Sequence, residues 1–557
     1  MGGERVDGAW AARRAGVFVG VIEETGRMAV GMVCGLTVAA STAALALTPV
    51  SVGSVGEWSP ASTLAGCSAA GAPRVVFPKD SPTQSTGAGA IVWGSGGGCK
   101  EAGVAAGAWV AAIGAGDVPG MAEPARTAAG GRLALGPPVA AVEGPHGKIL
   151  LAGAAGGGAS GGGVGDGGGA SGGGAAGERL VVSEGNAGGG FSDERTTGGP
   201  AWPVGLASGY LGDVAIGALV PAAGASPRGS GKSFQNGGPA RARAHARGAA
   251  ISNTSPATEE ALESTPDEEA LEMWVHRYYQ GGFQTGTRIG RAARGSVEGL
   301  TVALDYRSDG LAVWAQGGAV YGRSLPASDR SSQPLQRVAG TAGKTAIAAL
   351  LSDDNRGIVA WSVTAQGVTS VYGELTGPQV RFRAGGGRLL ERFRDPHGQA
   401  PPAYAGPRLI RLASESVMLA WTGVGRGTDG DRWAVHATAV DLNGVGSSET
   451  ISPAGRDGLL AGLAAGPADD GFALIYEPAE TAGGADLKEG GLYGARGGDE
   501  HPDRTRFGAV EEIAGAGPEG TNGEAGIGVD PDSDRAIAAW RTPAGGVESS
   551  VRELAEG

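Results

Sequence analysis

The residue patterns that could carry out nucleophilic chemistry lie in unsuitable surroundings. The motif G-x-S-x-G places a nucleophilic serine on a tight strand-to-helix turn, and it occurs at Gly158-Ala-Ser-Gly-Gly162 and Gly169-Ala-Ser-Gly-Gly173. Both copies lie in glycine-rich sequence that lacks the flanking strand and helix. Gly229-Ser-Gly-Lys-Ser233 matches the end of a phosphate-binding loop, but Ser226 stands where the first glycine is required. We interpret all three as chance matches and predict no catalytic residues.

The signals for metal binding are equally incomplete. The six histidines share no i, i+3 or i+4 spacing, and no Cys/His cluster has the spacing of a metal site. Asp530-Pro-Asp-Ser-Asp534 resembles the start of a calcium loop, yet Arg541 occupies the twelfth position, where a bidentate Glu is needed. The same residues are typical of a polar turn between strands. The sequence therefore predicts no metal ion and no cofactor.

One pattern points toward glycan chemistry. Ser308-Asp-Gly-Leu-Ala-Val-Trp314 is similar to the sialidase Asp box, S-x-D-x-G-x-T-W, although its Ser and Asp are adjacent and Val313 replaces Thr. Sialidases also need three arginines around a substrate carboxylate, which guanidinium groups bind in a bidentate manner. The candidate arginines are Arg323, Arg381, Arg408 and Arg411. A sialidase-like or other glycan-active hydrolase or lyase is therefore our alternative function.

The elements that would position any such site come from a repeat. An apolar run and a polar turn, such as Asp305-Tyr-Arg-Ser-Asp-Gly310, lead into a second apolar run that ends in an aromatic residue. Strands that are apolar at consecutive positions are typical of sheets covered on both faces. We predict a β-propeller of about eight four-stranded blades, with seven as the alternative count. The aromatic residues expected to fill the wedges between blades are Trp93, Trp314, Trp361, Trp421, Tyr476 and Trp540.

The two ends of the repeat region complement each other. The last unit ends after Val547-Glu-Ser-Ser-Val551 and lacks an outer strand, whereas Glu57-Trp-Ser-Pro-Ala-Ser-Thr63 precedes the first unit and belongs to none. We predict that this N-terminal segment supplies the missing outer strand, because closure removes the exposed sheet edges of an open array. The propeller would span residues 57–557. Low-complexity insertions at 153–177 and 221–270 both fall between the second and third strands of a unit. We expect both insertions to lie on one face of the ring. Either they form a binding face, or they reflect neutral drift in loops that tolerate insertion.

Composition and the N-terminus indicate where the protein acts. Residues 1–56 contain an uncharged run from Met28 to Leu47, with Arg27 before it and small residues after it, which indicates a secretory signal; an uncleaved anchor is the alternative. We predict a secreted or cell-surface protein without a further membrane span. Cys67 and Cys99 would then form a disulfide, the alternative being two free thiols. The net charge of −13 argues against a nucleic-acid partner.

These features together resemble a known group. The leader, the two cysteines flanking Gly89-Ala-Ile-Val-Trp93 and the repeat units are similar to those of uncharacterised exported actinobacterial repeat proteins, which are predicted to be β-propellers. The resemblance covers about residues 57–554 and implies the fold and an extracytoplasmic location, but no activity. Our functional hypothesis is a monomeric, non-catalytic scaffold that binds a glycan, a protein or a cell-envelope partner.

Overall fold

Tight polar turns join the short apolar strands, as the repeat predicts. In the computed structural model, Asp305 accepts hydrogen bonds from the backbone N–H groups of Arg307 (2.9 Å) and Asp309 (2.8 Å), which closes the turn. Ser308 in the same turn adopts a positive φ of 64°, and Asn355 adopts 59° in the corresponding turn of the next repeat. Side-chain oxygens that satisfy turn amides make such backbone conformations acceptable. Each turn therefore reverses the chain into an antiparallel hairpin.

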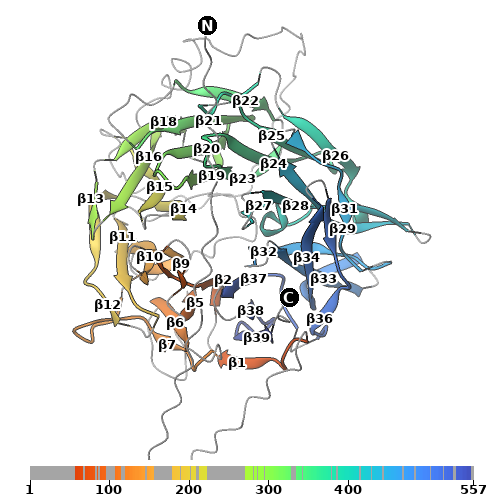
Figure 1. Ribbon diagram of the computed structural model, residues 1–557, viewed down its shortest axis with the longest axis horizontal. Coiled ribbons are helices and arrows are strands. Elements are labelled where there is room, and N and C mark those ends of the chain that lie inside the picture. Colours follow the sequence, from red (N-terminus) through yellow and green to blue (C-terminus); the bar gives the residue numbers. More distant parts are fainter. Residues whose placement is uncertain are drawn as a thin grey trace, which may run out of the picture. The chain divides into compact units, whose positions relative to one another are not determined.

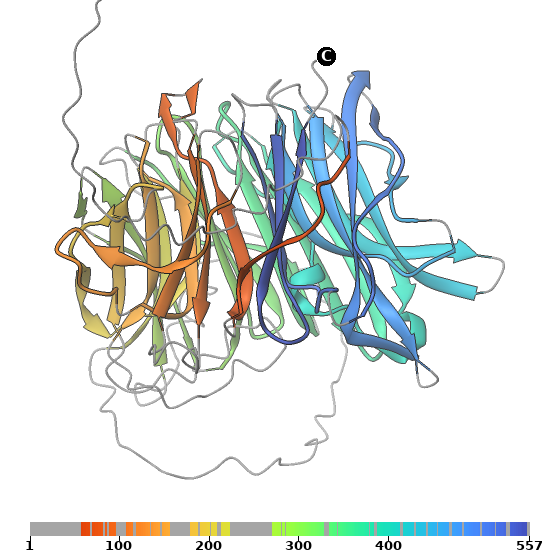
Figure 2. The ribbon, with the colours of Figure 1, turned by 90° about the horizontal axis from the view of Figure 1, so that it is seen from below.

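The structure describes residues 57–553 with gaps, the longest at 156–178 and 223–269 and a shorter one at 96–106. These residues belong to one unit of the chain, Val50–Gly557. Within it, eight sheets, built almost entirely of antiparallel pairs, are arranged as a ring around a common centre (Figure 1). Successive strands of each sheet follow one another from the centre outward, and in Figure 2 the strands run roughly along the axis of the ring. The predicted eight-bladed propeller is confirmed.

The first four blades follow one another along the N-terminal half of the chain. Their strands are, for blade 1, β2 (Ala69–Val76), β5 (Gly89–Ser95), β6 (Gly107–Ile113) and β7 (Glu123–Pro124); for blade 2, β9 (Gly136–Glu143), β10 (Ile149–Ala155), β11 (Arg179–Gly185), β12 (Gly190–Phe191) and β13 (Arg195–Pro200), with β8 (Arg126–Thr127) beside β12; for blade 3, β14 (Trp202–Ser208), β15 (Val214–Pro221), β16 (Ala270–Tyr279), β17 (Gly282–Phe283) and β18 (Thr287–Ala293); and for blade 4, β19 (Val297–Leu304), β20 (Gly310–Gln316), β21 (Ala319–Leu325) and β22 (Gln336–Gly340). A small hairpin of β3 (Lys79–Ser81) and β4 (Gln84–Ser85) lies between β2 and β5 in the sequence.

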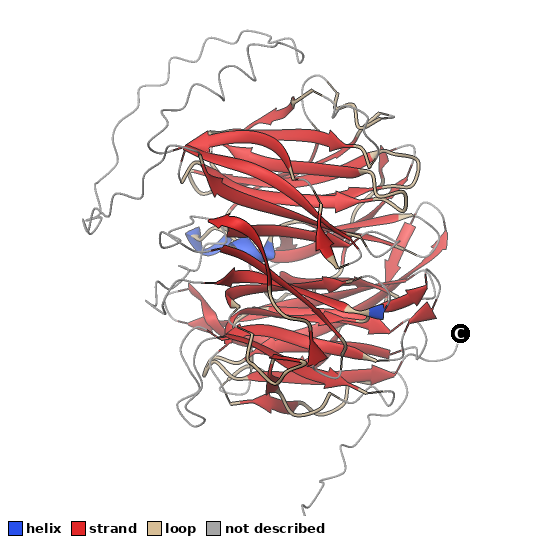
Figure 3. Cartoon of the chain, turned by 90° about the vertical axis from the view of Figure 1, so that its left-hand side faces the viewer, coloured by secondary structure: helices blue, strands red, loops and turns tan. Residues whose placement is uncertain are grey.

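The remaining four blades complete the ring. Their strands are, for blade 5, β23 (Lys344–Leu351), β24 (Gly357–Ala365), β25 (Val368–Leu375) and β26 (Arg388–Arg394); for blade 6, β27 (Arg408–Arg411), β28 (Val417–Gly427), β29 (Gly430–Asp441), β30 (Gly444–Val445) and β31 (Glu449–Thr450); for blade 7, β32 (Leu459–Ala465), β33 (Asp470–Thr481), β34 (Gly484–His501), β35 (Arg504–Phe507) and β36 (Glu511–Ala514); and for blade 8, β37 (Ala525–Asp530), β38 (Arg535–Arg541), β39 (Val547–Glu553) and β1 (Ser62–Ala65). Two 3₁₀ turns, η3 (Pro396–Gly398) and η4 (Ala403–Ala405), precede β27. Strands dominate the described chain (Figure 3), and none of its helices is long and apolar enough to cross a membrane.

The repeat aromatics lie in the interior between blades. Trp314 on β20 packs with Met273 and Ile289 of the preceding blade, and Trp93 on β5 packs with Ile537 of blade 8. A side chain as large as indole fills the space that widens between two radially packed sheets. The exposed fractions of the six side chains are 0% for Trp93, Trp314, Tyr476 and Trp540, 1% for Trp361 and 2% for Trp421.

The N-terminal segment closes the ring, as the sequence predicts. Strand β1 pairs antiparallel with β39, so the first and last strands of the propeller lie in one sheet. Ser59 donates its backbone N–H to the carbonyl of Val551 at 2.8 Å, and Ser550 Oγ donates to the carbonyl of Ser59 at 2.6 Å. Leu64, 2% exposed, is buried with residues of blades 1 and 8. The strand therefore fastens the end of the ring to its beginning.

Both predicted insertions fall between the second and third strands of their blades. In blade 2 the gap at 156–178 separates β10 from β11, and in blade 3 the gap at 223–269 separates β15 from β16. Strand β10 extends to Ala155, which pairs with Arg179, so the first residues of the predicted 153–177 insertion are strand. The leader, Cys67, Cys99 and residues 531–534 of the calcium-like turn lie outside the described residues. The disulfide therefore stays a prediction.

Candidate functional site

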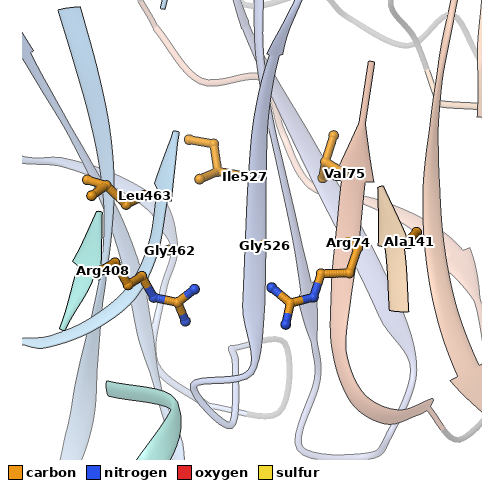
Figure 4. Close-up of a pocket in the computed structure, with 8 residues that line it drawn as sticks. All are labelled: Arg74, Val75, Ala141, Arg408, Gly462, Leu463, Gly526 and Ile527. Atoms are coloured by element: carbon orange, nitrogen blue, oxygen red, sulfur yellow. The ribbon is translucent and has the colours of Figure 1, made fainter. Parts of the chain in front are cut away.

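A cavity of about 200 Å³ lies at the centre of the ring, among the innermost strands of five blades (Figure 4). Strands β2, β9, β27, β32 and β37 form its walls. Six of the eight lining residues are apolar or glycine, yet most of the surface exposed in the cavity is polar, and two arginines supply its charge. The lining residues are Arg74, Val75, Ala141, Arg408, Gly462, Leu463, Gly526 and Ile527.

Close contact between two glycine-containing inner strands positions Arg74. A Cβ atom at Gly526 of β37 would lie 2.2 Å from the carbonyl oxygen of Pro73, and one at Gly528 would lie 2.7 Å from a methyl group of Val75. No other residue type allows β37 to approach β2 so closely. On the β2 side, an irregularity in the pairing with β5 falls between Ala70 and Arg74. The guanidinium group of Arg74 points into the cavity (Figure 4).

Arg74 has no hydrogen-bond or ion-pair partner among the residues that the structure describes. Its side chain is exposed to solvent, although the inner strands that line the cavity surround it. This burial inside the ring lowers the pKa of Arg74 from its usual value. The side chain is accessible to a ligand and at the same time incompletely solvated.

Backbone carbonyl groups from two places hold Arg408. Its Nη2 atom donates to the carbonyl of Tyr404 at 3.0 Å and to that of Ala461 at 2.9 Å. Its buried Nε has no hydrogen-bond partner among the described residues. Burial, with a smaller contribution from the positive charge of Arg74, lowers the pKa of Arg408 to about 10. Because a guanidinium group does not lose its proton in proteins near neutral pH, the cavity holds two positive charges.

The chemistry available in this cavity is recognition of negative charge. Two guanidinium groups approach each other from blades 1 and 6 (Figure 4). None of the described lining residues is an acid, a histidine, a cysteine or a hydroxyl residue. These residues therefore offer no general acid or base and no nucleophile. They do offer hydrogen-bond donors for an oxyanion.

The four arginines proposed from the sequence do not meet at one point. Arg408 lines the cavity, whereas Arg411 pairs with Asp353 at 2.5 Å. Arg323 lies on the third strand of blade 4 and donates to the carbonyl of Ile289 at 3.2 Å. Arg381 lies in a bridge with Gly377 after β25. The arginine that faces Arg408 is Arg74, which sequence reasoning missed, although a charge inside the apolar pattern of an inner strand is the signal that marks it.

Polar clusters outside the cavity hold parts of the scaffold together. His397, at a positive φ of 56°, contacts the buried carboxylate of Asp457 through Nε2 at 2.8 Å. Asp457 also accepts the backbone N–H of Trp433 at 2.8 Å, which fixes the loop after β26 against blade 6. No group of three or more His, Cys, Asp or Glu residues in the described part of the chain could hold a metal ion.

Glu374 on β25 is a buried carboxyl group whose pKa lies far from its usual value. Its side chain is 4% exposed, and its Oε1 accepts the backbone N–H of Arg383 at 2.7 Å. Burial raises its pKa to about 7, against the smaller lowering effects of Arg383. A carboxyl pKa that is higher in the folded than in the unfolded protein means that the folded state binds the proton more tightly. The contribution of Glu374 to the free energy of unfolding is therefore fully present below the unfolded pKa of 4.5 and is lost as pH rises through 7.

We predict that Glu374→Gln raises the melting temperature at pH 8.5 and leaves it unchanged at pH 4.5. Glutamine keeps the acceptor for Arg383 but cannot ionise, so it removes a penalty of up to about 3 kcal/mol at alkaline pH. Melting temperatures of both proteins across this pH range test the prediction. Glu489→Gln, on an exposed side chain, controls for the change in net charge. Parallel pH profiles for wild type and Glu374→Gln would contradict it.

Comparison with known proteins finds only distant similarities. No protein-family model and no curated protein matches the chain. Among solved structures, the chain is similar to the Dos1 propeller, with 7% identity over 90% of this chain and 97% of that one and a TM-score of 0.43. It is also similar to an ulvan lyase of a new polysaccharide-lyase family, with 10% identity over 87% and 96% of the two chains and a TM-score of 0.40. A protein of unknown function from Dyadobacter fermentans shares 10% identity over 90% and 97%, with a TM-score of 0.32.

These similarities are too distant to carry a statement about activity, and they do not bear on export or on the bacterial group that the sequence resembles. The sheet topology of the chain itself establishes the architecture. The chain is an eight-bladed β-propeller with two arginines converging in its central cavity.

Proposed function

We propose that this protein is an exported, non-catalytic propeller scaffold that binds its partner at the central cavity. The observation that carries the proposal is the pair Arg74 and Arg408, which face each other in a cavity whose described lining contains no acid, base or nucleophile. Such a site attracts a ligand without the groups needed to break a bond in it. The partner classes are a glycan, a protein or a component of the cell envelope.

The ring supports a binding role through rigidity. Inner strands from five blades contribute to the cavity, and buried aromatic side chains pack between neighbouring blades. Preorganised donors lose little conformational entropy when a ligand arrives. Export is part of the proposal because of the uncharged run Met28–Leu47.

A glycan-active hydrolase or lyase is the second candidate, and the position of Arg408 in the cavity favours it. Such an enzyme would use the arginine pair to hold an acidic sugar. It would also need a proton donor or acceptor next to the scissile bond. The described wall supplies none, so we rank binding first.

The experiment is a binding screen followed by a test of turnover. The full-length protein would be applied to arrays of acidic and neutral glycans and of peptides, and each bound compound would then be incubated with the protein and analysed by mass spectrometry. We expect compounds that bind and stay intact, and at least tenfold weaker binding to Arg74→Gln. Arg392→Gln, an exposed arginine on β26, is the matched control and should bind normally. Cleavage of a bound glycan would replace the proposal with the enzyme, and binding that is equal in Arg74→Gln would remove the cavity from it.

A further inference from the structure

We propose that the outer edge of blade 5 is a second binding surface, which takes an acidic polysaccharide along a strip of exposed arginines. This arginine strip consists of Arg381, Arg383, Arg388, Arg392 and Arg394. It lies on β26 and the loop before it, on the outer circumference of the ring, whereas the cavity lies among the innermost strands (Figure 1). The inference therefore goes beyond the proposed function and does not depend on it.

The strand register sets the arginines in single file. Arg394 lies opposite the first residue of β25, and Arg388 lies opposite the sixth. The backbone N–H of Arg383 bonds to the side chain of Glu374, the seventh residue of that strand. In the described part of the chain, β26 is the outermost strand of its sheet. The strip therefore follows the edge of the blade along the whole length of β25.

The acidic groups of the same segment point into the protein. Glu374 is buried, and so is Asp395, which accepts the hydroxyl of Thr369 at 2.6 Å. The carboxylate of Glu391 accepts the indole N–H of Trp421, on blade 6, at 2.8 Å. Residues 374–395 contain no other acid. The fold therefore sorts the charges of this segment, with the positive ones on the surface and the negative ones against the interior.

The positive charges of the strip are uncompensated. The side chains of Arg381, Arg392 and Arg394 have no hydrogen-bond or ion-pair partner among the residues that the structure describes. Arg388 donates to the carbonyl of Val445 at 2.6 Å, and this neutral group leaves its charge in place. The formal net charge of the chain is −13, and without these five arginines it would be −18. Because salt screens charges beyond about 8 Å at physiological ionic strength, a ligand on the strip interacts mainly with the arginines.

The form of the strip favours a single linear polyanion. Duplex DNA is wider than one strand and would bring further phosphates against the acidic remainder of the chain. An acidic peptide that pairs with β26 would meet an irregular edge, because the register shifts between Leu389 and Glu391. A second copy of this strip would repel the first. A polysaccharide with carboxylate groups binds guanidinium groups through charge and paired hydrogen bonds and needs no strand pairing.

The test compares four polymers with the full-length protein at about 0.15 M salt. Polygalacturonate carries a carboxylate on each sugar, polyglutamate carries one on each amino acid, dextran is an uncharged polysaccharide, and duplex DNA is a two-chain polyanion. We expect polygalacturonate to bind most tightly, at least threefold more tightly than polyglutamate. The carboxylate of galacturonate sits directly on a rigid ring, so fewer bonds lose their rotation for each charge that binds. Its affinity should also fall as salt rises.

Variants assign the binding to the strip. Arg381→Gln/Arg394→Gln removes one charge near each end and breaks no side-chain contact with a described residue. It should weaken polygalacturonate binding about tenfold. The control Arg132→Gln/Arg179→Gln removes two exposed arginines elsewhere on the molecule and should bind normally, and thermal melting would show that both variants fold. Equal binding of dextran, tighter binding of polyglutamate or DNA, or unchanged binding in Arg381→Gln/Arg394→Gln would each overturn the inference.

The strip and the cavity can fail separately. A ligand of the cavity loses affinity in Arg74→Gln and keeps it in Arg392→Gln, because Arg392 lies on the outermost strand of its blade. Polygalacturonate should bind Arg74→Gln as tightly as the wild type. If it instead loses affinity in Arg74→Gln and keeps it in Arg381→Gln/Arg394→Gln, the polymer is a ligand of the cavity and the strip fails. If it binds through the strip and no compound binds through Arg74, the strip stands and the cavity fails.

Discussion

Removing residues 1–65 will lower the melting temperature by about 5 °C and cause the protein to associate. The deletion takes away β1, including Leu64, and leaves β39 as an unpaired edge of blade 8. Losing a buried leucine and several strand hydrogen bonds costs on the order of 5 kcal/mol. An uncovered edge also provides a template for pairing with a second chain. Thermal unfolding and light scattering would measure the two effects.

The matched control for this deletion is a chain that begins at Glu57. It keeps β1 and the bridge between Trp58 and Arg552, so it should melt close to the full-length protein. If the chains starting at Glu57 and at Gly66 melt at the same temperature as monomers, the closing strand contributes nothing and our account of the ring is wrong.

Trp314→Ala should cost about 3–5 kcal/mol of folding free energy. The indole ring is fully buried between blades 3 and 4, stacks on Tyr321 with 5.8 Å between ring centroids, and donates its N–H to Gln316 at 3.3 Å. Alanine would leave a cavity at the interface of two sheets, which rigid packing cannot refill. Urea unfolding and thermal melting would measure the loss.

Two further variants sharpen this test. Trp314→Phe keeps an aromatic ring but loses part of the buried ring volume and the hydrogen bond to Gln316, so its cost should be smaller than that of alanine. Met121→Ala removes a side chain that is 78% exposed, and it should change stability by no more than about 0.5 kcal/mol. A loss below 1 kcal/mol in Trp314→Ala would mean that the wedge aromatics do not hold the blades together.

Local chemistry that recurs is what made the fold predictable. The turn at Asp305–Gly310 and the apolar run ending in Trp314 each reflect forces within a few residues, and their repetition along the chain predicted the blades. The missing outer strand of the last unit predicted the role of residues 57–63 for the same reason. Boundaries were less certain: β10 continues through Gly153, Ala154 and Ala155 because small residues pair in a strand as well as they form a coil.

The cavity could not be predicted in the same way. Arg74 and Arg408 lie on different blades, and only closure of the ring brings their inner strands to opposite sides of one channel. Arg408 stood among four arginine candidates because composition alone ranks all arginines equally. Arg74 carries a local signal, because it interrupts an inner strand that is otherwise apolar or small. Arg408 does not, because it is the first residue of β27, a four-residue strand that also ends in an arginine, Arg411.

The pairing of β1 with β39 also has a consequence for synthesis of the chain. Ser62 and Ser549, which lie side by side in the finished sheet, are 487 positions apart. At ordinary translation rates the ribosome needs about 25–100 s to cover that distance. The first strand to leave the ribosome is therefore the last to gain its neighbour, and throughout that interval it must be kept from pairing with another nascent chain.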